Sequence, residues 1–321
     1  MTMGPEQADQ VLRRHRLDPP EVDPPALHPP RTRRWRRPWI AAAAAMVTVL
    51  GVASVLAWSQ RTTDVQVPPL LEYQPAAASD PQNLLRELAD VAERQAVVGS
   101  GSVHYAKTRT WSFTTDATTR GDTIGTDIRE GTVELWERPD GSGYRTTKGG
   151  QLPFDTADTV APQTDPPAHS TGPVPPDLRD LPVRDAGSAV VDRLDARKPV
   201  GELLDDVADA WVKRSGDPTT AAAVLRFLAD RHGLQVAGTT TDRAGRAAVA
   251  VSAEVTLGRG WFPHQRRYLL IDPTTGFPLA LEHVALAADA QALGIRVATP
   301  VTVHYTLFER GGWVEQVRQP L

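Results

Sequence analysis

The longest apolar run in the sequence covers Trp39 to Trp58, WIAAAAAMVTVLGVASVLAW, and contains no charged residue. A helix of these 20 residues rises about 30 Å, which matches the hydrocarbon thickness of a bilayer. Tryptophan stands at both ends, where indole rings favour the membrane interface. Because no face of the run is polar, the pattern predicts one transmembrane helix at 39–58 rather than a buried helix of a soluble domain.

The arginines around this run predict its orientation. Five of them lie between Arg31 and Arg37, on the N-terminal side, whereas only Arg61 lies close to the other end. Positively charged flanks stay in the cytoplasm, so we expect a single-pass protein of the cell membrane with a cytoplasmic N-terminus and an extracytoplasmic C-terminal domain. The residues expected at the membrane interfaces are Arg33, Arg34, Arg36, Arg37, Trp39 and Trp58.

A cleaved signal peptide is the alternative. Ala57-Trp58-Ser59 is a poor version of a small-x-small cleavage site, and Arg33-Arg34 loosely resembles a twin-arginine signal. However, the apolar run exceeds the usual length of a signal-peptide core, and the 38 residues before it would be a long leader. The sequence therefore favours an uncleaved anchor.

Residues 1–38 form a basic, Pro-rich cytoplasmic tail. Residues 5–17 can form a short helix with Val11, Leu12 and Leu17 on one side, and the DPPEVDPPALHPP segment that follows cannot continue it. This helix is a candidate docking motif for a cytoplasmic partner, and the arginines suit the headgroups of the lipid bilayer. The plainer interpretation is a disordered tail that only sets topology.

The residues after the span divide into a linker and a folded domain. Residues 59–79 contain three prolines and are expected to be the linker. Asp80-Pro81 then combines an N-cap with a proline at the first helical position. Apolar residues recur at helical spacing from Leu84 onward, so we expect a helix that docks one face on a core and ends near Gly99.

A strand-rich block follows this helix. In SVHYAKTRTWSFTT the apolar positions share one parity and the polar positions share the other, which is the alternation of a half-buried strand. GTVELWERP and GYRTTK, joined by Asp140-Gly141-Ser142-Gly143, predict a hairpin. Residues 151–183 carry eight prolines and are expected to be a long Pro-rich loop.

Two helices and a meander of strands complete the pattern. The helices are expected at about 201–214 and from Asp217 to about His232. The alternating segments GRAAVAVSAEVTL, RRYLLID, PLALEHVALA and VTVHYTLFER read as strands, the last with Thr302 and His304 facing outward. Helices segregated from an antiparallel sheet mean an α+β fold, so residues 80–321 are expected to form one α+β domain.

The composition excludes several kinds of functional site and partner. The chain has no cysteine, which excludes disulfides, thiol nucleophiles and cysteine-based zinc sites. Residues 1–38 carry eight Arg against five acidic residues, and residues 59–321 carry 27 Lys and Arg against 34 acidic residues. The outer domain is therefore mildly acidic, and nucleic acid is not an expected partner. Abundant Ala, Arg and Pro with scarce Lys are typical of GC-rich genomes and indicate an actinobacterial source.

No motif for catalysis, metal binding or cofactor binding stands out. The sequence lacks HExxH, GxSxG, a P-loop and a dinucleotide-binding glycine motif that opens a helix after a strand. His104 and His304 fall on the outer faces of predicted strands and would meet if those strands are neighbours, but two histidines without a carboxylate make a poor metal site. We therefore expect no enzyme activity, no metal and no cofactor.

Aromatic residues concentrate in the first strand block. Packing in the core is the plainer explanation of this pattern. The alternative is that some of them line an apolar cavity on the inner face of the sheet, where a lipid or another apolar ligand would bind. The candidate ligand-binding residues are Tyr105, Trp111, Phe113 and Trp136.

Several stretches together resemble one protein family, an uncharacterised actinobacterial family of single-pass membrane proteins encoded beside extracytoplasmic-function sigma factors. The resemblance covers most of the chain. The stretches that carry it are the Arg-flanked span, the helix after Asp80-Pro81, Glu134-Leu135-Trp136 with Asp140-Gly141, Asp242-Arg243-Ala244-Gly245-Arg246, Ile271-Asp272-Pro273-Thr274-Thr275-Gly276 and Gly312-Trp313-Val314.

The resemblance implies an outer domain similar to the periplasmic lipoprotein-carrier fold, a curved antiparallel sheet or half-barrel partly closed by helices. It implies a membrane-anchored sensor or binding protein linked to sigma-factor signalling, with a lipid, lipoprotein or other apolar ligand outside. The partner of the tail would be a cytoplasmic sigma factor or regulator. The remaining alternative is a structural or protein-interaction protein of the cell envelope with no ligand.

Overall fold

The computed structural model describes residues 67–77, 80–116, 125–152, 168–173, 187–258, 260–293 and 296–321. They belong to one compact unit, Gln60–Leu321. The predicted tail, the predicted span and its interface residues lie outside the described part of the chain, so the membrane anchor stays a prediction. No helix within the described residues is long and apolar enough to cross a bilayer.

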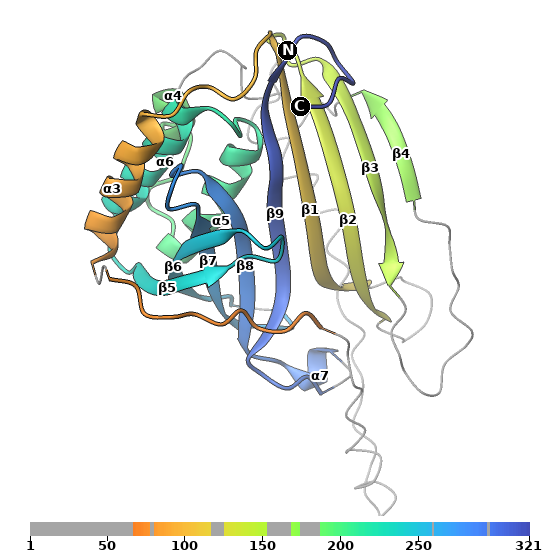
Figure 1. Cartoon of the computed structure of the whole chain (residues 1–321). Coiled ribbons are helices and arrows are strands. Elements are labelled where there is room, and N and C mark those ends of the chain that lie inside the picture. The colour runs from red at the N-terminus through yellow and green to blue at the C-terminus, as the bar shows by residue number, and fades with distance from the viewer. Residues whose placement is uncertain are drawn as a thin grey trace, which may run out of the picture. The chain divides into compact units, whose positions relative to one another are not determined.

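Nine strands form one curved antiparallel sheet that stays open at both edges (Figure 1), in the order β4-β3-β2-β1-β9-β8-β7-β6-β5. The last strand in the sequence, β9, lies between β1 and β8 and joins two halves built from consecutive hairpins. This confirms the predicted α+β fold with a curved antiparallel sheet. The strands are β1 (Val103–Asp116), β2 (Gly125–Glu137), β3 (Gly143–Leu152), β4 (Ala168–Pro173), β5 (Gln235–Thr241), β6 (Ala247–Thr256), β7 (His264–Ile271), β8 (Pro278–Ala287) and β9 (Val301–Val314).

The predicted helix starts are confirmed by their caps. Asp80 and Asp217 each accept a hydrogen bond from the main-chain N–H two residues later, which satisfies one of the free donors at a helix N-terminus. The helices are α3 (Pro81–Glu93), α4 (Ser188–Val191), α5 (Val200–Val212), α6 (Pro218–Ala229) and α7 (Ala290–Leu293).

Helix α3 ends at Glu93, six residues before the predicted end at Gly99. The reason is tertiary pairing of the segment that follows. The Val98 N–H donates to the Gly216 carbonyl at 3.0 Å, and the Val98 carbonyl accepts from Trp313 N–H at 2.8 Å. These bonds hold the chain in an extended path toward the end of β9, where a helical path would lose them.

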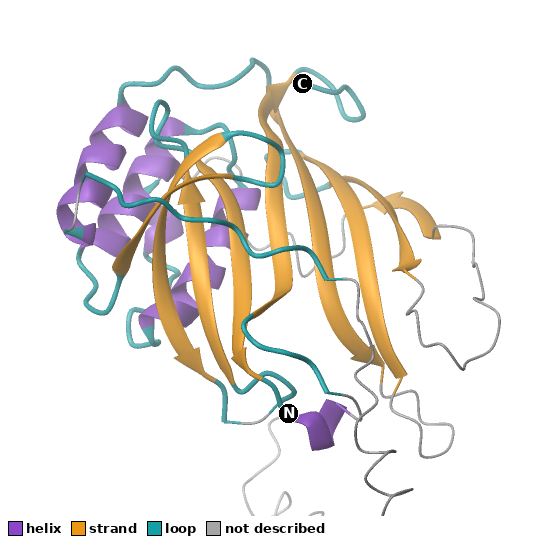
Figure 2. Ribbon diagram, turned by 60° about the horizontal axis from the view of Figure 1, so that its bottom comes forward, coloured by secondary structure: helices purple, strands orange, loops and turns teal. Residues whose placement is uncertain are grey.

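Helices α3, α4, α5 and α6 cover one face of the sheet, on the half that contains β6, β7 and β8 (Figure 2). Helix α5 lies against these strands, and α3 packs on α6. Their apolar faces meet the sheet in the larger core cluster, in which Leu85, Leu204, Leu228 and Leu269 are fully buried. Burial of each such side chain contributes about 1.5–3 kcal/mol, so this layer supplies much of the stability.

The opposite face of the same strands is also buried. A second cluster joins side chains of β1, β6, β7, β8 and β9 with residues 67–73 and α7. Strand β6 shows the effect most clearly, because Val249 and Val251 belong to the helix-side core while Ala248 and Ala250 belong to the second cluster. The sequence alternation predicted a strand with one solvated face, whereas β6 is covered on both faces.

Two further segments differ from the sequence expectation. Strand β4 lies within the segment expected to be an irregular Pro-rich loop, and it pairs with β3 from Tyr144↔Pro173 to Gly149↔Ala168. Thr302, expected to face outward, is fully buried. The register of β9 against β8 shifts between His283 and Val284, so a strict alternation cannot hold through this part of β9.

Candidate functional site

Two of the predicted aromatic residues, Tyr105 and Trp136, belong to a row that crosses three strands. Tyr105 stands opposite Trp136, and Trp136 stands opposite Tyr144. The ring centroids are 5.1 Å and 6.2 Å apart along this row. With Val103 and Val314 they form a cluster separate from the two larger cores. Burial is the main cause of the raised pKa of Tyr105, whose hydroxyl donates to Glu134 at 2.9 Å.

The other two predicted residues, Trp111 and Phe113, lie in the second cluster. Trp111 stacks on Tyr305 with ring centroids 6.2 Å apart, and Phe113 meets Phe262 edge to face at 5.2 Å. The structure therefore brings the four candidates together as two pairs and not as one cavity wall. All four are buried against protein side chains, so a ligand at either pair would have to displace part of the chain.

Residues 67–77, here called the strap, cross the second face of the sheet (Figure 1). Val67, Leu71 and Tyr73 pack on the second cluster. The Tyr73 ring stacks on Tyr268 of β7, with centroids 4.9 Å apart and planes at 9°. Burial raises the pKa of the Tyr73 hydroxyl, and the nearby Glu282 carboxylate raises it further. The sequence placed these residues in a linker, and only their tertiary contacts show that they belong to the core.

A buried ion pair lies beside the strap. Arg243 Nε donates to Glu282 Oε1 at 2.9 Å, and Arg243 Nη2 donates to Glu282 Oε2 at 3.1 Å and to the Pro69 carbonyl at 3.0 Å. The guanidinium also lies 4.9 Å from the centre of the Tyr305 ring. The Glu282 side chain is 1% exposed and the Arg243 side chain 11%, so the two charges depend on each other for solvation. Arg243 thereby ties the strap to β8 and β9.

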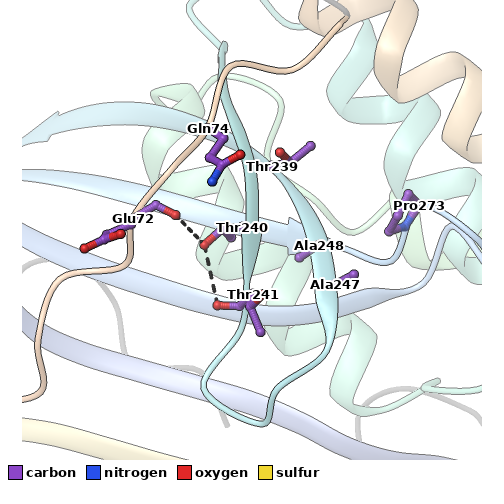
Figure 3. Close-up of a pocket in the computed structure, with 8 residues that line it drawn as sticks. All are labelled: Glu72, Gln74, Thr239, Thr240, Thr241, Ala247, Ala248 and Pro273. Carbon is purple, nitrogen blue, oxygen red and sulfur yellow. Dashed lines mark hydrogen bonds between the residues drawn. The ribbon is translucent and has the colours of Figure 1, made fainter.

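A groove of about 550 Å³ opens between the strap and the edge strand β5 (Figure 3). Gln74 and Thr239 exchange both main-chain hydrogen bonds at 2.8 Å, and the Thr240 hydroxyl donates to the Glu72 carbonyl at 2.8 Å. The strap thus pairs with β5 at one residue and protects part of an edge strand. The lining residues are Glu72, Gln74, Thr239, Thr240, Thr241, Ala247, Ala248 and Pro273.

The two histidines predicted to lie on outer faces do not meet. His304 pairs with Ser112 of β1, whereas His104 stands eight residues along β1 opposite Trp313. Neither lies on a solvated face. Burial lowers the pKa of His304 to about 3, helped by the neighbouring His283, and burial lowers the pKa of His104 to about 4. His104 and His304 are therefore neutral at physiological pH.

His304 instead lies next to His283, with ring centroids 4.9 Å apart. His283 Nε2 is 2.8 Å from Asp205 Oδ1 of α5, and Asp205 also forms an ion pair with Arg267. This network ties α5 to β7, β8 and β9. No sequence pattern could reveal it, because Asp205 and His283 are 78 residues apart. Within the described residues, no group of three or more histidines, aspartates or glutamates is arranged to hold a metal ion.

Glu137 and His104 form a second buried polar pair, opposite each other on β2 and β1. Both are fully buried. His104 Nε2 lies 3.0 Å from the Ser215 carbonyl and therefore donates to it. Neither carboxylate oxygen of Glu137 has a hydrogen-bond partner among the described residues. Burial raises the pKa of Glu137 to about 7, against the opposing effect of Arg214 and Lys213.

No family model matches the sequence, and no curated protein matches it. The solved structures that are similar include the following two. One is the MucA/MucB complex of Pseudomonas aeruginosa, at 14% identity and a TM-score of 0.26, covering 74% of this chain and 59% of that chain. The other is MucB in complex with MucA(peri), at 13% identity and a TM-score of 0.26, covering 74% of this chain and 58% of that chain. The match thus spans less than two thirds of those chains, and a TM-score this low carries no conclusion about function.

Proposed function

We propose that this chain is a membrane-anchored extracytoplasmic sensor or binding protein and not an enzyme. The observation that supports the proposal is the path of the strap. It follows the predicted span in the sequence, within the predicted linker, and it packs across a face of the sheet through Tyr73. A change on that face would therefore move the residues that connect the domain to the membrane.

The ligand we propose is a lipid or another apolar molecule that competes with the strap. The strap places only three half-buried apolar side chains on the second cluster, Val67, Leu71 and Tyr73. They pack on the second cluster, which contains Tyr268, Trp111 and Phe113. An acyl chain that covered the same apolar area would offset the loss of these contacts, because apolar burial is not directional.

The signal would then pass inward through the tail. We propose that residues 1–38 hold a cytoplasmic regulator, such as the sigma factor that the family resemblance implies, at the membrane. Release of the strap would lengthen the segment of chain that connects the domain to the predicted span at 39–58. It would also change how closely two copies of the protein can approach each other in the membrane.

The test is hydrogen exchange on the full-length protein in nanodiscs, with and without palmitate as the apolar probe. We expect palmitate to lower the protection of amides in residues 70–77 and to leave the amides of α5 unchanged. Tyr73→Ala should bind palmitate more tightly than the wild type, whereas Asp195→Ala, on an exposed turn away from the strap, should not differ from it. Binding of palmitate with unchanged protection of the strap would refute the coupling.

The alternative function is a structural or protein-interaction module of the envelope without a ligand. The observation that favours it is that all four predicted ligand-binding residues already pack against protein side chains. It predicts that neither the wild type nor Tyr73→Ala binds palmitate.

A further inference from the structure

The residues that follow β9 lie over the aromatic row on β1, β2 and β3. Val317 and Leu321 are the described residues outside the sheet that pack against the cluster of Val103, Tyr105, Trp136 and Val314. No helix belongs to this cluster, in contrast to the larger core. We call these four residues together with Tyr144 the slot, and residues 315–321 the cover.

The slot contacts the cover through the main chain as well as through apolar side chains. Trp136 Nε1 donates to the Gln319 carbonyl at 2.6 Å, and Arg310 Nη1 donates to the Leu321 main-chain oxygen at 2.8 Å. The Arg318 guanidinium lies 4.8 Å from the centre of the Tyr144 ring, which is a cation–π contact. Indole donors and aromatic faces that engage a peptide backbone are features of peptide recognition.

Space for Leu321 depends on a glycine. A Cβ at Gly99 would clash first with the Trp313 main-chain carbonyl oxygen and would also lie 2.8 Å from Leu321 Cδ1, so a larger residue there would disturb both β9 and the leucine side chain. Gly99 also has a φ of 76°, which favours glycine. Leu321 therefore packs closely between Gly99 and the slot.

Burial is unequal between the slot and its cover. Tyr105 is 1% exposed and Trp136 5% exposed, whereas only Val317 and Leu321 of the cover are even half-buried. The remaining five residues of the cover are exposed. A cover with so few buried atoms is held weakly, and its departure would leave an aromatic patch open to solvent, which marks an interaction site.

We propose that the slot is a peptide-binding site, which the cover occupies as an internal ligand, and that a partner protein binds there with a segment of the same chemistry. That segment carries two branched apolar side chains four residues apart, as Val317 and Leu321 are, with an accessible carbonyl and a basic residue between them. The tethered cover competes at an effective concentration on the order of millimolar, so the partner segment binds tightly only when the cover leaves.

Tyr105 of the slot and Trp111 of the second cluster share one parity along β1 and so lie on the same face of the sheet, but the two clusters are separate. The proposed occupant of the slot is a peptide and not an acyl chain. The slot residues belong to a cluster of their own, apart from the second cluster that the strap covers. Failure of the peptide proposal would leave the proposed sensor function standing, and failure of palmitate to bind would leave the peptide site standing.

The experiment measures binding of a fluorescein-labelled peptide of residues 312–321 by anisotropy. The protein is the full chain with residues 315–321 deleted, compared with the wild type. We expect the truncated protein to bind with a Kd on the order of micromolar and the wild type to bind at least tenfold more weakly. The matched control peptide carries Val317→Ser and Leu321→Ser and should lose at least tenfold in affinity.

A conservative variant tests the indole contact. Trp136→Phe in the truncated protein keeps an aromatic ring but removes the N–H that donates to Gln319. We expect the affinity for the peptide to fall about threefold to tenfold, the effect of one hydrogen bond. An unchanged affinity would place the peptide elsewhere and overturn the assignment of the slot.

Two further measurements test the proposal if the truncated protein fails to fold. The full chain with Val317→Asp and Leu321→Asp keeps its length but loosens the cover, and it should bind the peptide as the truncated protein would. In the wild type, amides of residues 315–321 should exchange at least tenfold faster than those of β9. The proposal would be overturned by a folded variant that does not bind the peptide at millimolar concentration. It would also be overturned if the amides of the cover were protected from exchange as strongly as those of β9.

Discussion

The phenol rings of Tyr73 and Tyr268 lie almost parallel, with centroids 4.9 Å apart. Tyr73 belongs to the strap and Tyr268 to the middle of β7, so this stack joins the segment nearest the predicted membrane span to the sheet. Arg243 makes a second connection between the strap and the sheet, because it donates to the Pro69 carbonyl and to the buried Glu282. The sheet therefore holds the strap, which follows the predicted span in the sequence, at two points.

Tyr73→Ala should lower the free energy of unfolding by roughly 2 kcal/mol, because it removes a half-buried ring and its stacking contact. Tyr73→Phe should be neutral or slightly stabilising, since the Tyr73 hydroxyl is buried without a hydrogen-bond partner among the described residues. Urea denaturation of the two variants measures the difference. Equal destabilisation by both substitutions would mean that the hydroxyl, and not the stack, holds the strap.

Removing one partner of the Arg243–Glu282 pair should destabilise the protein by about 3 kcal/mol, because the remaining charge stays buried and unpaired. Arg243→Met and Glu282→Gln are the single variants. The double variant should lose less than the sum of the two, since neither charge is then left alone. Strict additivity in urea denaturation would show that the pair is not coupled.

Glu137 should make stability depend on pH near neutrality. Its pKa in the folded protein is about 7, above the ordinary value of 4.5. The folded state therefore binds this proton more tightly than the unfolded state, and the stabilisation is complete below about pH 4.5 and lost as the pH rises through about 7. The loss between these limits is on the order of 3 kcal/mol.

Glu137→Gln replaces the titratable carboxyl with an amide. The stability of the variant should therefore depend less on pH in this range. The measurement is the stability difference between wild type and variant at pH 5 and at pH 8, which cancels the contribution of other groups. We expect the variant to gain on the wild type as the pH rises. A difference that stays constant between the two pH values would show that Glu137 does not titrate in this range.

The predicted orientation can be checked with protease on intact spheroplasts. Protease should digest the domain and spare a tag placed at Met1, because the arginines before Trp39 predict a cytoplasmic N-terminus. Protection of the C-terminal domain would reverse the orientation. Recovery of a soluble mature protein that begins near Gln60 would replace the anchor with a cleaved signal peptide.

Deleting residues 2–30 tests the role of the tail, since the deletion leaves Arg31 to Arg37 and the predicted span intact. We expect transcription that depends on the sigma factor implied by the family resemblance to change in this strain as it does when the whole gene is removed. A strain that matches the wild type, while removal of the gene has an effect, would show that the tail does not signal.

Signals between residues close in the chain determined much of the architecture. Asp80-Pro81 and Asp217-Pro218 predicted the starts of α3 and α6, and both caps form as expected. The hairpin joined by Asp140-Gly141-Ser142-Gly143 forms as predicted between β2 and β3, with the Arg138 N–H donating to the Ser142 carbonyl at 2.7 Å. Such signals succeed because the groups that make each contact lie within a few residues of each other.

The candidate site depended on contacts that no local pattern encodes. The sequence singled out Tyr105, Trp111, Phe113 and Trp136 by their residue type, but it could not divide them into two clusters. That division follows from the place of β9 between β1 and β8, and from which segment covers each cluster. The strap looked like a linker for the same reason, since its prolines are visible in the sequence and its partner Tyr268 is not.

The sequence by itself therefore determined the alternation of helices and strands, the α+β class and the apolar run predicted to span the membrane. Only the tertiary structure decided which faces of the sheet are covered, which charges are buried in pairs, and that residues 315–321 lie over Tyr105 and Trp136. The physical reason is the entropic cost of bringing together residues that are far apart in the chain. A cap or a turn forms between neighbouring residues at little entropic cost, whereas Arg243 meets Glu282, and Trp136 meets Gln319, only after the whole sheet has assembled.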